Sequence, residues 1–211
     1  MSGRPGFYER RVLPRLIGCA CSQPVLTRLR AEVVPQARGA VFELGCGGGL
    51  NQPFYRPEQI SRFVGIDPNL ALLDAARAAA ARRFADSAFH QTGGEAIPAA
   101  DAAFDSIVCT FTLCSVTDHP RTIAEMRRVL KPDGVLLFVE HGRAPDSGVQ
   151  RWQRIVEPVW KRLAGNCHLT RPIAVALADQ GFTVEPMGRE YIARTPRPLG
   201  WTEWGRAVRT A

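Results

Sequence analysis

The sequence predicts an α/β fold in which a mostly parallel sheet is covered by helices on both faces. Short apolar runs alternate along the chain with longer segments of helix-forming composition, and short links join them. The first run, from Ala40 to Leu44, passes directly into glycines, and a later run from Phe63 to Ile66 ends in Asp67. Both endings are typical of parallel strands that hold a ligand outside their carboxyl ends.

The other elements follow from apolar composition and spacing. Helices are predicted over 69–84, from a cap at Thr117 or Asp118 to Leu130, over 152–160 and over 171–180. The last strand is expected to run antiparallel to its neighbour. Seven segments have strand-like composition: 40–44, 63–66, 87–92, 104–109, 135–139, 182–184 and 204–208.

Residues 1–38 precede the first strand and are predicted to form two helical segments. In the second segment Val25, Leu26, Leu29 and Val33 form one apolar side. We expect this region to be an N-terminal helical lid over the ligand. A helix packed on the sheet edge and a helix lying on a membrane surface are the alternatives.

The composition is that of one soluble globular domain. The chain has 211 residues, of which 45% are hydrophobic and 22% charged. No apolar run approaches the roughly 18 residues that span a bilayer, and Arg10, Arg11 and Arg15 interrupt any signal-like core. We therefore expect a cytoplasmic, monomeric protein with a single domain over 1–211, divided into the lid at 1–38, a ligand-binding core at 39–142 and a cap at 143–211.

Charge and cysteine usage exclude some partners. The net charge is +7, but the arginines are spread along the chain, which favours a solvated surface over a nucleic-acid interface. Six cysteines are present, and Cys19-x-Cys21 lacks the second pair or histidines of a zinc site. We predict reduced thiols and no metal.

The glycine-rich stretch indicates the ligand. Its glycines do not have the Gly-x-Gly-x-x-Gly spacing of a dinucleotide site, and Glu43 stands where a phosphate would be repelled. Asp67, after the second strand, is placed to accept hydrogen bonds from both hydroxyls of a ribose. A cationic nucleoside without phosphates satisfies both observations, and S-adenosylmethionine is such a molecule.

The order of motifs resembles a class I S-adenosylmethionine-dependent methyltransferase over roughly residues 38–142. The matching segments are Glu-x-Gly-x-Gly from Glu43, the acid at Asp67, Gly-Glu-x-x-Pro at 94–98, Phe-Asp-x-Ile-Val at 104–108 and Arg-x-Leu-Lys-Pro-x-Gly at 128–134. The resemblance implies a Rossmann-like fold with a seven-stranded sheet. It also implies that the glycine loop contacts the methionine portion of the cofactor, Asp67 the ribose, and Glu95 and Ala96 the adenine. The complete set of implied cofactor contacts is Glu43, Gly45, Cys46, Gly47, Asp67, Pro68, Glu95, Ala96 and Thr110.

The flanking segments are similar to the animal alkyl thiol methyltransferases. They are Cys109-Thr110, Leu113 to Val116, Glu140-His141, the stretch from Trp152 to Trp160, and Cys167 to Arg171. The resemblance implies a small thiol as methyl acceptor and S-adenosyl-L-homocysteine as product. Those animal proteins begin with a hydrophobic membrane anchor, whereas arginines interrupt the N-terminal helix here, so membrane attachment is not carried over.

Two other functions stay open. A lipid, quinone or other small-molecule N-, O- or C-methyltransferase at a membrane surface would use the same core. A cofactor-binding protein without catalysis is the less favoured alternative. Enzymes that methylate nucleobase amines carry a Pro-Pro-Tyr type motif after the fourth strand, and the sequence there is Thr110-Phe111-Thr112-Leu113.

Methyl transfer requires few catalytic groups from the protein. Methyl transfer from a sulfonium is an in-line displacement, so the protein aligns the nucleophile, excludes water and helps remove a proton. His141 follows the fifth strand at the ligand edge and is the first candidate for this base. His168 is the second candidate, with Arg171 beside it, and both could orient or acidify a thiol.

Overall fold

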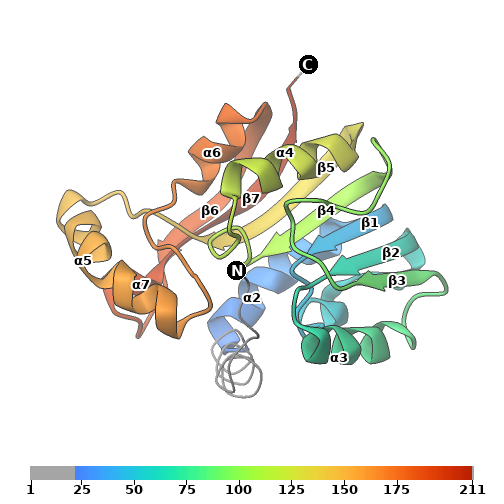
Figure 1. Ribbon diagram of the computed structural model, residues 1–211, viewed down its shortest axis with the longest axis horizontal. Coiled ribbons are helices and arrows are strands. Elements are labelled where there is room, and N and C mark those ends of the chain that lie inside the picture. The colour runs from blue at the N-terminus through green and yellow to red at the C-terminus, as the bar shows by residue number, and fades with distance from the viewer. Residues whose placement is uncertain (1–21, 211) are drawn as a thin grey trace, which may run out of the picture.

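The computed structural model describes residues 22–210 and shows one seven-stranded mixed sheet (Figure 1). The strand order is β3-β2-β1-β4-β5-β7-β6. All pairs from β3 to β5 are parallel, and β7 is antiparallel to both of its neighbours. The strands are β1 (Gly39–Leu44), β2 (Ile60–Ile66), β3 (Ser87–His90), β4 (Phe104–Thr110), β5 (Leu130–His141), β6 (Phe182–Tyr191) and β7 (Trp201–Arg209). The predicted fold class, including the antiparallel last strand, is confirmed.

Helices cover both faces of the sheet. On one face, α4 (His119–Val129) and α6 (Ile173–Asp179) pack with β1, β4 and β5 around Phe42, Ile107 and Phe138. On the other face, α2 (Pro24–Val33) and the end of α3 (Leu70–Ala80) pack against Val41, Phe63 and Val108. Two further helices, α5 (Ser147–Leu163) and α7 (Arg197–Gly200), lie beyond the β6 side of the sheet (Figure 1).

The central strands are apolar on both sides because helices cover both faces of the sheet. Val41, Phe42 and Leu44 of β1 are buried, and Phe42 contacts one core while Val41 contacts the other. Burial on both faces is what a continuous apolar run in a parallel strand predicts. The sheet is therefore a rigid platform for the loops at its carboxyl ends.

Some predicted boundaries differ from the structure. The helix predicted over 69–84 begins after Asn69, whose side chain caps it by accepting a hydrogen bond from the Leu72 amide, and it ends at Ala80. Asp118, not Thr117, caps α4. The strand predicted at 182–184 extends to Tyr191, and α7 was not predicted.

The second N-terminal segment is a helix, as predicted. Leu26, Leu29 and Val33 of α2 are buried against the sheet. The first predicted helical segment lies outside the described residues.

The chain reverses direction across the sheet between β1 and β4. From β1 it proceeds outward through β2 to β3, then returns to β4 on the other side of β1. In doubly wound sheets the loops diverge at this point, and ligands bind there, outside the carboxyl ends of the strands.

Candidate active site

A cavity of about 740 Å³ opens at the carboxyl edge of the sheet. This volume lies in the range of small-molecule and cofactor sites. One end is formed by the loops after β1, β2 and β3, and the other by the loops after β4 and β5 together with α5. Of the residues predicted from sequence, the cavity is lined by Glu43, Gly45, Cys46, Gly47, Asp67, Pro68, Glu95, Thr110 and His141.

The glycine loop after β1 exposes bare backbone to this cavity. Gly45 has φ +65°, and a Cβ there would lie 2.2 Å from Oγ1 of Thr112. Gly47 has φ +50°, and no atom lies within 4 Å of the position that its Cβ would occupy. Only glycine adopts this backbone readily, so the loop leaves an open cradle for a ligand.

Glu43 lies beneath that loop as a buried carboxyl group. One carboxylate oxygen accepts a hydrogen bond from Nδ2 of Asn51 at 2.8 Å, and the other accepts one from the hydroxyl of Tyr55 at 2.9 Å. Burial raises the pKa of Glu43 to about 7, although these two hydrogen bonds and the nearby charge of Arg30 oppose the shift. The Asn51 amide also donates to Oγ1 of Thr110 at 3.0 Å, which links the ends of β1 and β4.

Asp67 follows β2 on the same side of the cavity. Its two carboxylate oxygens accept hydrogen bonds from the Gly47 amide at 2.9 Å and the Asn69 amide at 2.8 Å. Burial raises the pKa of Asp67, and the two amides oppose this shift. Each oxygen retains a second lone pair, so the carboxylate can still accept hydrogen bonds from a pair of hydroxyl groups.

Glu95 and Ala96 separate in the structure. Glu95 lines the cavity, and its carboxylate accepts hydrogen bonds from the amides of Thr117 at 3.1 Å and Asp118 at 3.2 Å. Ala96 is exposed and is absent from the cavity lining. The contact of Ala96 with adenine stays a prediction.

The opposite end of the cavity contains His141, two cysteines and apolar side chains. Nδ1 of His141 lies 4.0 Å from Sγ of Cys167, and its ring packs edge-on against Phe111, with 5.2 Å between the centroids. Phe111 has φ +54°, a strained backbone for a non-glycine residue. The rest of this end is lined by Cys114, Trp160, Leu163, Ile192 and Leu199.

His168 lies outside the cavity lining, in contrast to His141. Its Nδ1 is 3.6 Å from a carboxylate oxygen of Glu157, and burial is the main cause of its lowered pKa. Arg171 donates hydrogen bonds to the carbonyls of Leu113 at 2.6 Å and Val116 at 2.8 Å, so it ties the loop after β4. The described geometry gives neither residue direct access to a methyl acceptor.

Glu140 is a functional candidate that the sequence analysis did not single out. Its fully buried carboxylate accepts hydrogen bonds from the amides of Thr112 at 2.8 Å, Leu113 at 2.9 Å and Cys114 at 3.1 Å. Burial raises the pKa of Glu140 to about 7, against the effect of these amides. These hydrogen bonds to Glu140 fix the loop after β4. The sequence feature that could have identified Glu140 is an acid at the end of an apolar strand.

Arg30 of α2 was also missed. It is 3% exposed and lines the cavity, and its guanidinium lies 5.2 Å from the centroid of the Phe111 ring. A buried arginine on an otherwise apolar helix face is a signal in the sequence, because arginine is rarely buried without a role. With Arg30, α2 contributes a cation next to the glycine loop.

Comparison with known proteins assigns the family. Residues 42–138 match the family described as "Methyltransferase domain". Thiol S-methyltransferase TMT1B from Rattus norvegicus is 40% identical over 133 residues, or 62% of this chain and 54% of the rat protein. The protein of the same name from Homo sapiens is 37% identical over 170 residues, or 79% of this chain and 67% of the human protein.

This chain belongs to the thiol S-methyltransferase family of class I methyltransferases. It spans about half the length of the rat relative and about two thirds of the human one. A solved S-adenosylmethionine-dependent methyltransferase from Mesorhizobium loti shares the fold, with a TM-score of 0.66 and 20% identity over 89% of this chain and 99% of that one. The methyltransferase family to which the chain belongs implies S-adenosylmethionine as its cofactor, as the sequence predicts.

The residues of this methyltransferase fit that cofactor. The open cradle at Gly47 admits a ligand to the loop backbone, and the carboxylates of Asp67 and Glu95 at the same end disfavour phosphates. Within residues 22–210, no cluster of three or more side chains has the geometry to hold a metal ion. No helix in this part of the chain is both long and apolar enough to cross a membrane.

Proposed function

We propose that the enzyme transfers the methyl group of S-adenosylmethionine to the sulfur of a small thiol. The observation that carries this proposal is the division of one cavity into two ends. Acids and bare glycine backbone form one end, while His141, Cys114, Cys167 and apolar side chains form the other. A polar cationic nucleoside suits the first end, and a small apolar thiol suits the second.

At the cofactor end, each polar group has a separate partner. Asp67 accepts hydrogen bonds from the ribose hydroxyls, and Glu95 lies at the adenine side. The bare backbone of Gly45 and Gly47 lies against the methionine portion, and Arg30 supplies a cation for its carboxylate. Glu43 supports the loop from below through Asn51 and Tyr55.

At the acceptor end, the protein orients the thiol and receives its proton. S-Adenosylmethionine supplies an electrophilic methyl group that is activated by the positive sulfonium. A thiol with a pKa of about 8.5 is only a few per cent ionised at neutral pH, and its thiolate is the strong nucleophile. His141 lies where it can accept that proton, and Trp160 and Leu199 keep water from the reacting atoms.

The test compares methyl acceptors that differ in their nucleophilic group. The full chain is incubated with S-adenosylmethionine and, separately, with an alkyl thiol, the corresponding alcohol, the corresponding amine and a phenol. Product mass and fragmentation identify the methylated atom. We expect an S-methyl product from the thiol and little product from the others. Preferred methylation of the alcohol, amine or phenol would reject the thiol assignment.

A second candidate function is methylation of acceptors that are dissolved in a membrane. The observation that favours it is a stripe of exposed apolar side chains on α5, formed by Trp152, Ile155, Val159 and Leu163, which are 56% to 60% exposed. We call this set the α5 stripe. Leu163 also lines the cavity, so the stripe and the acceptor end are continuous.

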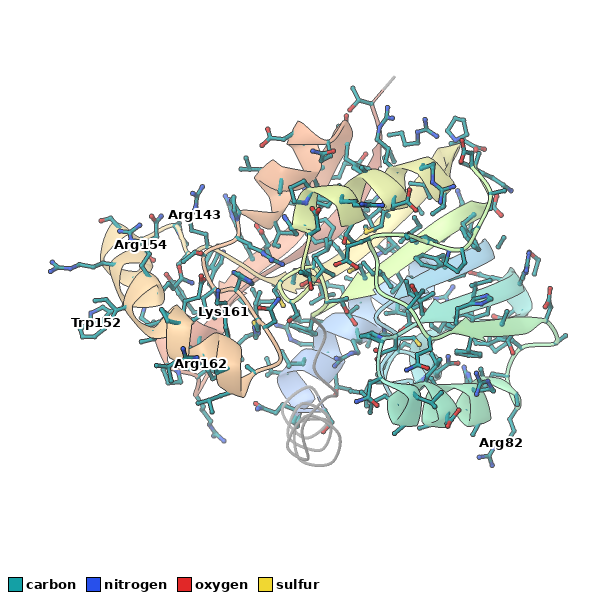
Figure 2. The ribbon with its side chains drawn as sticks, viewed as in Figure 1. Arg82, Arg143, Trp152, Arg154, Lys161 and Arg162 are labelled. Carbon is teal, nitrogen blue, oxygen red and sulfur yellow. The ribbon has the colours of Figure 1, made fainter. Side chains whose placement is uncertain are left out.

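Charges around the α5 stripe fit an anionic lipid surface. Arg151, Arg154 and Arg162 are exposed on the same helix, and Figure 2 shows Trp152 and Arg154 pointing away from the sheet. The one acidic residue of the helix, Glu157, is half-buried and bonded to Thr170. An amphipathic helix with basic flanks is typical of interfacial binding.

Vesicle flotation separates the two candidates. If membrane acceptors are used, the protein floats with vesicles that contain anionic phosphatidylserine, and Trp152→Ala with Ile155→Ala abolishes flotation. Leu70→Ala, an exposed apolar residue on α3, is the matched control. Absence of flotation together with methylation of soluble thiols would reject the membrane candidate and retain the thiol assignment.

A further inference from the structure

The acceptor end of the cavity contains two cysteines in contact, which the proposed methyl transfer does not use. Cys114 and Cys167 both line the cavity and share one apolar cluster with Leu169. The two side chains are buried next to each other in this cluster, and both thiols are free. The other described cysteines, Cys46 and Cys109, belong to different clusters. Cys114 and Cys167 are therefore the two described cysteines that share a cluster at the acceptor end of the cavity.

The two loops that carry this pair are tied to each other around it. The His168 amide donates a hydrogen bond to the Cys114 carbonyl at 2.8 Å. Nδ2 of Asn166 donates to the Ser115 carbonyl at 2.9 Å, and Arg171 bonds both Leu113 and Val116. These bonds occur immediately before and after each cysteine, so the backbones of the two loops are held side by side at the sulfurs.

The electrostatics make one sulfur of the pair a nucleophile. The neighbouring Cys114 thiol is the largest cause that lowers the pKa of Cys167, and His141 lowers it further. The neighbouring Cys167 and burial raise the pKa of Cys114. Cys167 is therefore the more acidic thiol of the pair and ionises before Cys114. An attacking thiolate beside a protonated resolving thiol is the arrangement that thiol–disulfide exchange requires.

We propose that Cys114 and Cys167 form a thiol–disulfide exchange site, whose substrate is the small disulfide formed by oxidation of the thiol acceptor. A molecule that enters the cavity as a thiol can enter as its disulfide by the same path. The exchange reaction itself rests on the geometry of the pair. Its relevance to methyl transfer rests on the proposed function.

The exchange proceeds in two displacements. The Cys167 thiolate attacks one sulfur of the small disulfide, whose S–S bond breaks, and one thiolate leaves. Cys114 then loses its proton to that leaving thiolate and attacks Sγ of Cys167, and the second small thiolate leaves. The two cysteines are oxidised by two electrons to a disulfide, and the small disulfide is reduced to one thiol and one thiolate.

Oxidation of the pair would switch off methyl transfer. Both sulfurs line the acceptor end, and a bond between them removes the thiolate beside His141 and changes the shape of that wall. The enzyme would be active while its acceptor is available in the reduced form and inactive when that acceptor is oxidised. Excess thiol reverses the switch by the same two displacements.

The test measures the covalent bond and the activity separately. The full chain with Cys19→Ser and Cys21→Ser is treated with bis(2-hydroxyethyl) disulfide, and intact mass and peptide mapping follow. We expect a loss of two hydrogens and a peptide cross-linked between Cys114 and Cys167. Methyl transfer to an alkyl thiol, measured as the initial rate before that thiol reduces the cross-link, should be nearly abolished and should rise as reduction proceeds.

Matched variants assign the roles within the pair. Cys167→Ser should prevent any adduct at this site, whereas Cys114→Ser should stop at a mixed disulfide on Cys167, with the mass of one probe half added. Cys109→Ser should keep the cross-link. A cross-link between other cysteines, no reaction in the folded wild-type pair, or a cross-linked enzyme with full activity would overturn the proposal. The mass results hold whether or not the acceptor of methyl transfer is a thiol.

Discussion

Nδ1 of His141 faces Sγ of Cys167 at a distance of 4.0 Å. Because Nδ1 is engaged by this contact, Nε2 is the ring nitrogen left to accept a proton from the methyl acceptor. The edge-on contact with Phe111 fixes the plane of the ring. A base on a rigid strand end, held by two neighbours, can orient a small thiol and deprotonate it in the same position.

Replacement of this base should slow methyl transfer in a pH-dependent manner. For His141→Ala we expect a decrease of about a hundredfold in kcat at neutral pH, which is the lower end of the range for loss of a general base. The decrease should shrink above about pH 8.5, where a free thiol ionises without help. Turnover of an alkyl thiol from pH 6 to pH 9 measures this. His90→Ala, an exposed histidine on β3, is the control. An equal effect at every pH would argue against a base.

The Asp67 carboxylate should control cofactor affinity. Asp67→Asn replaces one acceptor oxygen by a donor, so the Gly47 or Asn69 amide or a ribose hydroxyl loses its partner. A lost hydrogen bond to a charged group costs about 1.5–3 kcal/mol, which corresponds to an increase of about tenfold to a hundredfold in Kd. Calorimetric titration with S-adenosyl-L-homocysteine measures it. Asp86→Asn, exposed at the start of β3, should leave the Kd unchanged.

Arg30 should also contribute to cofactor binding, through the carboxylate of the methionine portion. Arg30→Ala removes the buried cation beside the glycine loop, and we expect a Kd for S-adenosylmethionine that is about tenfold higher. Arg28→Ala is the matched control on α2, because the Arg28 side chain is half-exposed and paired with Glu190. If both variants bind alike, the assignment of Arg30 is wrong.

Glu140 should make the stability of the protein depend on pH. Its pKa is about 7 in the folded protein and 4.5 ordinarily, so the folded state favours the protonated carboxyl group. The stabilisation that this proton provides is complete below the ordinary pKa and is lost as the pH rises through about 7. The shift corresponds to about 3 kcal/mol.

Urea unfolding at several pH values tests the role of Glu140. The difference in free energy of unfolding between the wild type and Glu140→Gln should decrease by about 3 kcal/mol from pH 4 to pH 8. Glu58→Gln, exposed on the 3-10 helix Pro57–Gln59, should retain the wild-type slope. An unchanged difference for Glu140→Gln would show that the carboxyl group titrates normally.

The sequence predicts the fold, and which strand-end residues line the cavity, because both depend on local patterns. A buried parallel strand is a continuous apolar run, and a glycine or acid at its end must lie at the carboxyl edge of the sheet. Glu43, Gly47 and Asp67 follow this rule and line the cavity. His141 does so as well, because it ends β5.

The acceptor end was harder to predict because its residues come from loops and α5. The sequence does not specify how the chain turns after a helix, and Asn166, with φ +66°, directs that turn here. The turn carries Cys167 into the cavity and His168 toward Glu157. Arg30 was missed because only tertiary packing brings α2 to the glycine loop.

The central claim is tested most directly by tracing a labelled methyl group. The enzyme, S-adenosylmethionine with a trideuterated methyl group and an alkyl thiol are mixed for a single turnover, with Asp67→Asn in parallel. We predict that the wild type places the intact trideuteromethyl group on sulfur, and that Asp67→Asn does so only at higher cofactor concentration. Tight cofactor binding without any labelled thiol would contradict the account.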